Sequence, residues 1–331
     1  MTQTMKAWFT VPGPEGAVFE LRETPVPSPG PGQVLVAVRA AGVNRGELIR
    51  GAQARSAIPS AQPTRAGGEF AGEIAALGEG VSDWKPGDRV MGRTAGSYAS
   101  YVAAFTRALM RIPEGMAWPE AAAVPNVFVT AHDALVTNAA PAPGESVMVT
   151  AASSGVGTAA LQIARHIGAN PVLATTRSPA KAAALRALGA HEVIDTREAG
   201  WVEAVRRATS GRGVDVIIDH VGGAMLAGNI EVLALAGRLV SVGRTGTWVG
   251  ECNLDEVARK RARIIGVTFR TRTPDEALAC SERFAGHLLG AVAQGALRPV
   301  LDRTFPFDRL TDAHTYMLSD VQTGKIVLAL S

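Results

Sequence analysis

Between Ser146 and Ala169 the chain reads SVMVTAASSGVGTAALQIARHIGA, which is a short β-branched run, a group of small residues and a helix with periodic apolar positions. In such a strand, turn and helix, a phosphate can contact the backbone, because the free N–H groups and the dipole of the helix start attract negative charge. The residues predicted to form the phosphate-binding turn are Ala152, Ser153, Ser154, Gly155, Val156 and Gly157.

Two alignments of a glycine fingerprint fit this turn. The run Gly155–Ala160 fits G-x-G-x-x-A, whereas a fingerprint that starts at Ala152 has Ala and Ser in place of two glycines and ends at Gly157. Both leave the backbone accessible to a phosphate. A glycine-rich turn with only a structural role is the alternative, and the segments that follow decide against it.

Strands and helices alternate after the turn. The pattern predicts strands at 171–176, 191–195, 214–220, 237–243 and 264–269, and helices at 179–188, 199–209 and 223–235. Such alternation is typical of an α/β fold with a Rossmann-type, doubly wound parallel sheet. We therefore interpret the turn as part of a dinucleotide-binding domain.

The end of the second strand of this domain favours one dinucleotide. An Asp or Glu there would bind the ribose 2′-hydroxyl of NAD, but no acidic residue occurs from Ser146 through His191. Thr176 and Arg177 end the strand and Lys181 follows one turn later. A guanidinium and hydroxyls bind a 2′-phosphate, so NADPH is favoured over NADH, with ordinary solvated cations as the alternative.

Composition limits the class of protein. The chain has 331 residues, enough for two domains, and a formal net charge of +3 from scattered basic residues, which does not indicate nucleic-acid binding. Two cysteines, Cys252 and Cys280, have no metal-binding or disulfide spacing. We find no leader or membrane-spanning run, and expect a cytoplasmic protein without membrane association.

The two ends of the chain differ from its middle. Residues 1–125 are rich in Pro and Gly, with short alternating runs that predict a β-rich domain, and a helix at 118–138 interrupted by Pro125 leads into the sheet. The tail, with a helix at 274–294, is too small for a third domain. We expect a discontinuous substrate domain of residues 1–125 plus 270–331 and a cofactor domain of residues 126–269.

The whole chain resembles the medium-chain dehydrogenase/reductase superfamily, in its zinc-independent quinone oxidoreductase and enoyl reductase branch. The motifs that carry the resemblance are PGPGQVLVAVRAAGVNRGEL, GGEFAGEIAALGEGV, WKPGDRV, AASSGVGTAALQIARHIGA, GVDVIIDHVGG, GRLVSVG and TGKIVL, in that order. The resemblance implies a GroES-like N-terminal domain beside the Rossmann domain. It also implies hydride transfer from NADPH to a quinone or an α,β-unsaturated carbonyl compound.

The sequence departs from the zinc-dependent members of that superfamily. Asn44 stands where they carry a catalytic Cys, and Gly67-Gly68-Glu69 replaces their Gly-His-Glu triplet. No Cys precedes Cys252 and no His precedes His132, whereas a catalytic zinc site needs about three protein ligands, normally His or Cys. We predict no metal site.

Asn44 and Glu47 are the first candidates for catalysis. They match an Asn-x-x-Asp pattern that borders nicotinamide and substrate in the resembling proteins, with Glu in place of Asp. The same spacing fits a helix cap, with Asn44 as N-cap and Glu47 as its capping-box partner, and this alternative stays open.

The proton donor is not evident. A pocket tyrosine found in relatives is absent from the stretch after Asn44, which leaves Tyr98, Tyr101 and solvent; packing is the favoured role for both tyrosines, and water is the default donor. The resemblance places Thr130, Gly243 and Arg244 near the nicotinamide. His220, at a strand end, is more readily a wall residue than an acid or base.

Two alternatives remain. An enoyl-CoA or carrier-bound enoyl thioester could be the substrate, with its phosphopantetheine arm bound by Arg45, Arg50, Arg55 or Arg65. The chain could also be a catalytically idle NADPH-binding protein, since fold does not fix activity. By analogy we expect a homodimer that pairs the strand at 264–269.

Overall fold

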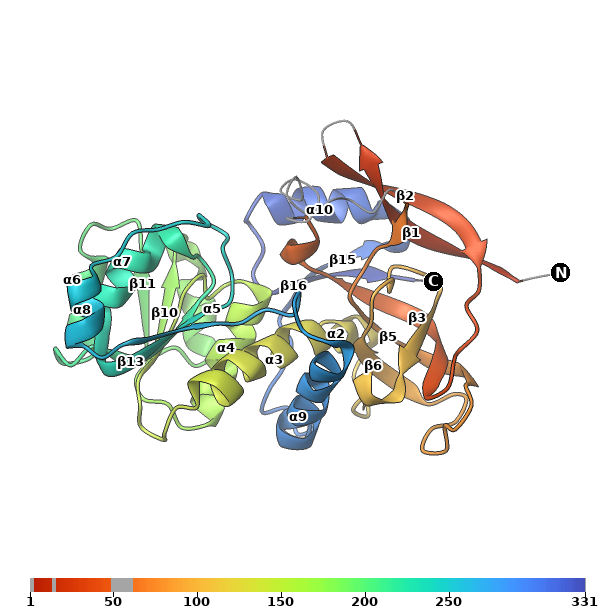
Figure 1. Cartoon of the computed structure of the whole chain (residues 1–331), viewed down its shortest axis with the longest axis horizontal. Coiled ribbons are helices and arrows are strands. Elements are labelled where there is room, and N and C mark those ends of the chain that lie inside the picture. The colour runs from red at the N-terminus through yellow and green to blue at the C-terminus, as the bar shows by residue number, and fades with distance from the viewer. Residues whose placement is uncertain (1–2, 14–15, 49–61, 331) are drawn as a thin grey trace. The chain divides into compact units, whose positions relative to one another are not determined.

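We analysed a computed structural model, which describes residues 3–13, 16–48 and 62–330. The chain forms two compact units, traced in Figure 1. The β-rich unit consists of residues 1–126, 278–294 and 298–331, and the α/β unit of residues 127–277 and 295–297. Each contains its own sheet and buried apolar core.

The α/β unit is built on a parallel sheet. Among the described residues its strand order is β11-β10-β9-β12-β13-β14, the order of a doubly wound Rossmann sheet, so the predicted fold class is confirmed. The strands are β9 (Val147–Val149), β10 (Val172–Thr176), β11 (Glu192–Asp195), β12 (Val214–Asp219), β13 (Leu233–Ser241) and β14 (Arg263–Gly266). The central strands are buried and mostly apolar, with Asp215 of β12 only half-buried, as expected for a sheet covered on both faces.

Helices connect these strands and cover the sheet. They are α4 (Gly155–His166), α5 (Ala182–Ala187) after the 3-10 turn η4 (Pro179–Lys181), α6 (Trp201–Ala208), α7 (Gly223–Val232) and α8 (Leu254–Arg259). Val205 of α6 and Ile230 of α7 pack with Met148, Leu173 and Ile217 of the sheet in one cluster. Figure 1 shows α6, α7 and α8 side by side against the strands.

One element boundary differs from its prediction. The helix expected to reach Leu235 ends at Val232, and strand β13 begins at Leu233 rather than at Gly237. Leu233 pairs with Val214, and the register then shifts so that Arg238 pairs with Val216. Ala236 has a φ of 59°, so a left-handed residue forms the irregularity that periodicity alone does not show.

The turn after β9 brings a helix unusually close to the preceding backbone. A Cβ added to Gly157 would lie 2.7 Å from the carbonyl oxygen of Ala152 and 2.8 Å from that of Ala151. Ala151 adopts a left-handed φ of 45°, which shapes the turn. Only glycine fits at position 157, and this is the packing role of the last glycine in a dinucleotide fingerprint.

The β-rich unit holds a mostly antiparallel sheet with strand order β15-β16-β3-β5-β6-β8, in which β7 pairs with β3, and a smaller sheet ordered β2-β1-β4. The strands are β1 (Thr4–Gly13), β2 (Gly16–Pro25), β3 (Gln33–Val43), β4 (Thr64–Arg65), β5 (Glu69–Leu77), β6 (Arg89–Arg93), β7 (Tyr101–Phe105), β8 (Leu109–Arg111), β15 (Leu301–Pro306) and β16 (Lys325–Ala329). The 3-10 turn η2 (Thr106–Ala108) joins β7 to β8.

Proline divides the helical segment that leads out of this unit. Helix α2 (Trp118–Ala122) begins with Pro119 in its first turn and the Glu120 carboxylate accepting from the Ala117 N–H at 3.1 Å. Helix α3 (Pro125–His132) starts at the second proline and continues as a π-helix, η3 (Asp133–Ala139). The predicted interruption at Pro125 is therefore confirmed, because proline lacks the N–H that a continuous helix requires.

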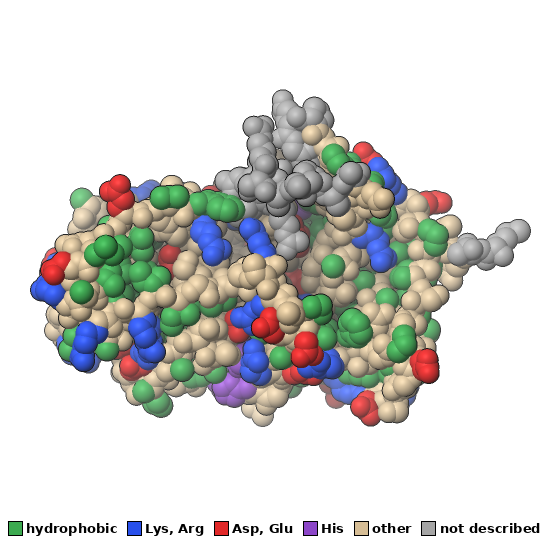
Figure 2. Space-filling view, viewed as in Figure 1, with side chains coloured by type: hydrophobic (Ala, Val, Ile, Leu, Met, Phe, Trp, Pro, Cys, Tyr) green, Lys and Arg blue, Asp and Glu red, His purple; other side chains and the backbone are tan. Residues whose placement is uncertain are grey.

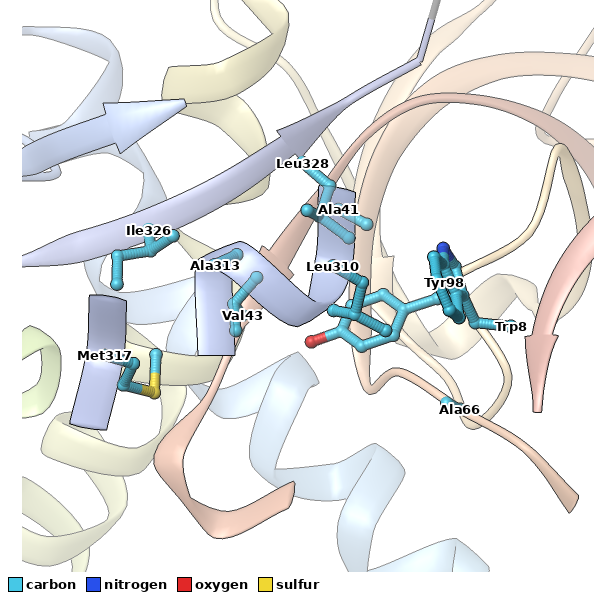
Figure 3. Packing of buried hydrophobic residues seen from close by; sticks show 10 residues of the cluster. All are labelled: Trp8, Ala41, Val43, Ala66, Tyr98, Leu310, Ala313, Met317, Ile326 and Leu328. Carbon is cyan, nitrogen blue, oxygen red and sulfur yellow. The ribbon is translucent and has the colours of Figure 1, made fainter. Parts of the chain in front are cut away.

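The tail of the chain adds to the β-rich unit. After α9 (Pro274–Ala293), strand β15 pairs parallel with β16, and β16 pairs antiparallel with β3. Between them lie the 3-10 turn η5 (Phe307–Arg309) and α10 (Leu310–Leu318). Figure 3 shows Leu310 and Met317 of α10 packed with Tyr98, Trp8 and Ile326 in one apolar cluster.

On the face seen in Figure 2, basic and acidic side chains are interspersed over the surface. This mixture agrees with the small formal net charge of +3. Among the described residues, the helices are too short or too polar to cross a bilayer.

The close approach at Gly157 makes a prediction about stability. Gly157→Ala is expected to lower the free energy of unfolding by about 1–3 kcal/mol, because the added methyl group overlaps two carbonyl oxygens and the backbone must shift. Urea unfolding measures the change. Gly286→Ala is the control, since Gly286 is exposed inside helix α9, a Cβ there meets no atom within 4 Å, and alanine favours a helix more than glycine does. Equal midpoints for both variants would contradict the close packing.

Candidate active site

A buried ion pair lies where three neighbouring inner strands of the β-rich sheet begin or end, β16 and β5 with β3 between them. Lys325 Nζ donates to Glu69 Oε1 at 2.6 Å, to Asn44 Oδ1 at 2.8 Å and to the Val43 carbonyl oxygen at 2.8 Å. Lys325 is 3% exposed and Glu69 is fully buried. The three donors of the ammonium thus meet three acceptors, which offsets the cost of removing this charge from water.

The ion pair fixes the orientation of Asn44. Its Oδ1 accepts from Lys325 and, at 2.8 Å, from Asn126 Nδ2, while its Nδ2 donates to Glu69 Oε1 at 2.9 Å. Glu69 Oε2 accepts from the Asn126 N–H at 2.7 Å. Gly42 permits this arrangement, because a Cβ there would overlap the Glu69 carboxylate.

Glu47 and Tyr98 extend the hydrogen-bond network from the Asn44 amide. The Tyr98 hydroxyl forms a short hydrogen bond with Glu47 Oε2 and lies 3.2 Å from the Gly42 carbonyl oxygen. Asn44 Nδ2 lies 3.3 Å from Glu47 Oε1. Tyr98 is fully buried, and Figure 3 shows its ring in the apolar cluster beside Trp8 and Leu310. Glu47 is half-buried.

This environment changes the acidity of both groups. Removal from water raises the pKa of Glu47 to about 7, although the Tyr98 hydroxyl, the Lys325 ammonium and the Asn44 amide act in the opposite direction. Burial and the neighbouring Glu47 carboxyl raise the pKa of Tyr98. Glu47 can therefore gain or lose a proton near neutral pH, whereas Tyr98 stays a neutral hydroxyl.

Of the capping box predicted for Asn44 and Glu47, the structure contains the contact from Glu47 but no capping contact from the Asn44 side chain. Glu47 Oε2 lies 3.4 Å from the Asn44 N–H, as in a capping box. The Asn44 side chain, however, bonds to Lys325, Asn126 and Glu69 instead. The amide serves mainly to order the buried network.

The residues present do not fit a zinc ion. The donor set is a pair of carboxylates and an amide, and the ammonium of Lys325 already occupies the position between Glu69 and Asn44. A catalytic zinc site takes His or Cys ligands and has no place for a second cation in contact with them. Among the described residues, we find no cluster of His, Cys, Asp and Glu suited to a metal.

In the α/β unit the predicted phosphate-binding turn precedes a 12-residue helix. Ser154 is the N-cap of α4, and its hydroxyl accepts from the Gly157 N–H at 3.1 Å. The first N–H groups of a helix have no acceptor inside it, so those of Gly155 and Val156 can bind a phosphate. Ser153 precedes them and is half-exposed. The cap and the close packing of Gly157 favour the fingerprint that starts at Ala152.

The end of β10 carries the groups predicted to select the dinucleotide. Thr176 Oγ1 accepts from the Ser178 N–H at 3.0 Å, and Arg177 is exposed at the strand end. Lys181 ends the 3-10 turn η4. Asp195, in register with Thr176 on the next strand, holds Arg197 through contacts of 2.6 and 3.1 Å. A guanidinium therefore offsets the acidic side chain at this edge.

The ends of β12 and β13 are tied together. A Cβ on Gly243 would lie 2.6 Å from the His220 carbonyl oxygen, and Arg244 next to it is half-buried. The Thr150 hydroxyl donates to Asp219 Oδ1 at 2.8 Å. His220 is buried, with Nδ1 bonded to the Thr150 carbonyl oxygen at 2.8 Å, and burial lowers its pKa. These contacts fit a wall residue.

The remaining candidates are dispersed. Thr130 lies half-buried in α3. Tyr101 begins β7, and Arg65 is exposed in β4. Arg45 bonds to the Met317 carbonyl oxygen at 2.7 Å and pairs with Asp320. Arg50 and Arg55 lie outside the described residues, so the predicted phosphopantetheine contacts there stay predictions.

Sequence reasoning gave no site role to Glu69, Lys325 or Asn126. The first two were present only as letters of family motifs, and Asn126 was not singled out. One signal was available: Glu69 begins a mostly apolar strand that also contains Glu73, and Lys325 begins an otherwise apolar strand. Two opposite charges at the starts of apolar strands favour a buried pair.

Two family models match the chain. Residues 30–114 match the alcohol dehydrogenase GroES-like domain, and residues 155–283 match the zinc-binding dehydrogenase model. The second match extends through the Rossmann strands and helices. Its description names a metal that the residues around Lys325 do not fit.

Similar proteins cover the chain from end to end. Human quinone oxidoreductase is 34% identical over 326 residues, covering 97% of this chain and 96% of that protein. A pikromycin polyketide synthase component of Streptomyces venezuelae is 35% identical over 98% of this chain, which spans 8% of that much longer protein. A solved NAD-dependent alcohol dehydrogenase superposes with a TM-score of 0.88 at 30% identity, with 99% of this chain and all of that one covered. With its GroES-like domain and Rossmann sheet, the chain is an oxidoreductase that belongs to the medium-chain dehydrogenase/reductase superfamily, in the quinone oxidoreductase-like branch.

Proposed function

We propose that this protein is an NADPH-dependent oxidoreductase that transfers a hydride to a quinone or an α,β-unsaturated carbonyl compound without zinc. The observation that carries the proposal is the Lys325 ammonium, held between Glu69 and Asn44 where a metal would need free ligands. The usual alcohol dehydrogenase mechanism uses a Lewis-acid metal to polarise an alcohol or ketone. A conjugated acceptor is already electrophilic and needs only a hydride and a proton.

The similar proteins support this substrate class. Human quinone oxidoreductase is among the relatives that cover the chain at matching length. The solved CurK enoyl reductase, which is 28% identical to this chain and superposes with a TM-score of 0.85, favours the second candidate, a reductase of carrier-bound or CoA-bound enoyl thioesters. Both candidates have an acceptor double bond conjugated to a carbonyl group, so one site can serve either.

The residues of the α/β unit fit a nicotinamide dinucleotide. The Gly155 and Val156 N–H groups would hold the pyrophosphate, as Gly157 lets helix α4 approach the turn. When bound, the reduced nicotinamide supplies the hydride. Within this unit, Thr130, Gly243 and Arg244 are proposed to border the nicotinamide, in line with the family resemblance.

NADPH is the proposed form of the cofactor. Arg177 and Lys181 lie at and after the end of β10, and Arg197 offsets the carboxylate of Asp195 beside them. These cations can form charged hydrogen bonds with the 2′-phosphate of NADPH, a group that NADH lacks. Because one solved neighbour is named NAD-dependent, the preference needs a direct test.

We also propose a homodimer formed through β14. This strand lies at one edge of the parallel sheet, and Ile264 on it is 51% exposed. An exposed edge strand can pair with a second copy of itself. Analytical ultracentrifugation tests the proposal, and a monomer mass would contradict it.

The role of Arg177 is tested by substitution. Arg177→Ser is expected to weaken NADPH binding about 10- to 100-fold, the effect of losing a charged hydrogen bond of about 1.5–3 kcal/mol, and to leave NADH binding nearly unchanged. Fluorescence titration gives both dissociation constants. Arg212→Ser is the control. Exposed Arg212 precedes the amino end of β12, whereas Arg177 follows the carboxyl end of β10, so the two arginines lie at opposite ends of the parallel strands. An equal loss for both cofactors would contradict the assignment.

The reaction itself is tested by following NADPH absorbance with a panel of quinones, enones and enoyl-CoA thioesters. Oxidation by a quinone or enone is expected. Preference for enoyl thioesters would favour the second candidate. Tight NADPH binding without oxidation by any member would overturn both and favour a catalytically idle NADPH-binding protein.

Removal of metal provides a separate test. Dialysis against a zinc chelator is expected to leave the rate unchanged, because Lys325 and the carboxylates around it offer no site for the ion. A loss of rate that zinc restores would show that the network rearranges to bind metal, and would contradict the proposed mechanism.

A further inference from the structure

The hydrogen bond between Glu47 and Tyr98 suggests where the proton comes from. We propose that the Glu47 carboxyl, positioned by the Tyr98 hydroxyl, is the acid that protonates the substrate oxygen after hydride transfer. This inference rests on the proposed function and deepens it, since solvent was the default donor. Glu47 is the catalytic residue, and buried Tyr98 is a positioning residue.

The Tyr98 hydroxyl can form a hydrogen bond with Glu47 whether the carboxyl is ionised or protonated. When Glu47 is ionised, the Tyr98 hydroxyl donates to Oε2. When Glu47 is protonated, its O–H can donate to the Tyr98 oxygen, and the Tyr98 hydroxyl can turn to the Gly42 carbonyl oxygen, 3.2 Å away. A hydroxyl is both donor and acceptor, so neither state leaves a buried polar atom unpaired at this position. The proton can therefore move with little cost.

The charges that face Glu47 balance one another. Among the described residues they are Lys325, from β16, and Glu69, from β5, whose effects on the Glu47 carboxyl have opposite signs. Because these two form their own ion pair at 2.6 Å, neither holds Glu47 in one state. Removal of the carboxyl from water then raises the pKa of Glu47 to about 7, where an acid is effective at neutral pH.

Gly68 lies beside the other carboxyl oxygen of Glu47. A Cβ added to Gly68 would lie 3.5 Å from Glu47 Oε1 and, among the described residues beyond its chain neighbours, would meet no other atom within 4 Å. By the family resemblance, Gly68 takes the position of a histidine in the zinc-dependent relatives, so no side chain from position 68 stands against this carboxyl oxygen. In the proposed reaction the substrate oxygen approaches Glu47 from this side. Glu47 and Gly68 are both half-buried, so each keeps some contact with solvent.

The step balances in protons and electrons. A quinone or enone that accepts a hydride gains two electrons and becomes an oxyanion. The O–H bond of Glu47 breaks as the new O–H bond forms on that oxygen, giving a hydroquinone or an enol and leaving the Glu47 carboxylate. Tyr98 then donates to the carboxylate, and a proton from water restores the acid.

Three variants test the assignment by pH profile. Glu47→Gln keeps the shape of the side chain but cannot act as an acid, so kcat is expected to fall about 10²- to 10⁴-fold, with NADPH affinity unchanged. In the wild type, kcat should fall as pH rises through about 7, where Glu47 ionises. Tyr98→Phe removes a donor that stabilises the carboxylate, so this fall should move to higher pH. Tyr101→Phe is the matched control: Tyr101 begins β7, three residues after Tyr98, and its loss should leave the pH profile unchanged.

An infrared titration provides a readout that needs no turnover. Difference spectra of the wild type between about pH 5 and about pH 9 should show the C=O band of a protonated carboxyl disappearing near neutrality. The band should be absent in Glu47→Gln and titrate at higher pH in Tyr98→Phe. If Glu47→Gln does not fold, the wild type, Tyr98→Phe and Tyr101→Phe spectra still decide.

The outcomes separate the two proposals. If wild-type protein oxidises NADPH but Glu47→Gln has the wild-type rate and profile, the acid assignment is overturned and the reductase stands. An infrared spectrum in which Glu47 is ionised throughout also overturns it. If no substrate is reduced while Glu47 titrates near neutrality, the proposed function fails, and with it the catalytic use of this proton.

Discussion

The buried contact between Lys325 and Glu69 orders the whole candidate site. It joins β16, from the end of the chain, to β5, and Asn44 at the end of β3 completes it. Removing one partner of such a pair leaves a buried charge without compensation, which costs about 3–5 kcal/mol. The pair therefore constrains the Asn44 amide, and through it the position of Glu47.

The site shows how one scaffold can replace a metal with side chains. A lysine supplies a fixed positive charge, but all three of its donors are already used by the protein, so it cannot polarise a substrate as a metal does. Chemistry must then rely on an acceptor that is already activated and on a group that can deliver a proton. Glu47 is the group in this network with both exposure and a suitable acidity.

Much of the fold was predictable because it depends on local patterns. The strand and helix alternation, the phosphate-binding turn and the interruption at Pro125 all come from residue spacing and from the backbone limits of glycine and proline. The start of β13 was not predictable in this way, since it depends on a left-handed Ala236 and a shift of pairing against β12. Neither leaves a periodic signal.

By itself, the sequence determined the fold class, the dinucleotide-binding turn and the absence of histidine and cysteine from the place where zinc would bind, because each is carried by residues close together in the chain. Only the tertiary structure decided how Asn44, Glu69 and Lys325 share hydrogen bonds, and that Tyr98 reaches Glu47 across 51 positions of sequence. Contacts between strands so far apart depend on sheet pairing. The raised pKa of Glu47 follows from its burial among those contacts, so no sequence motif could predict it.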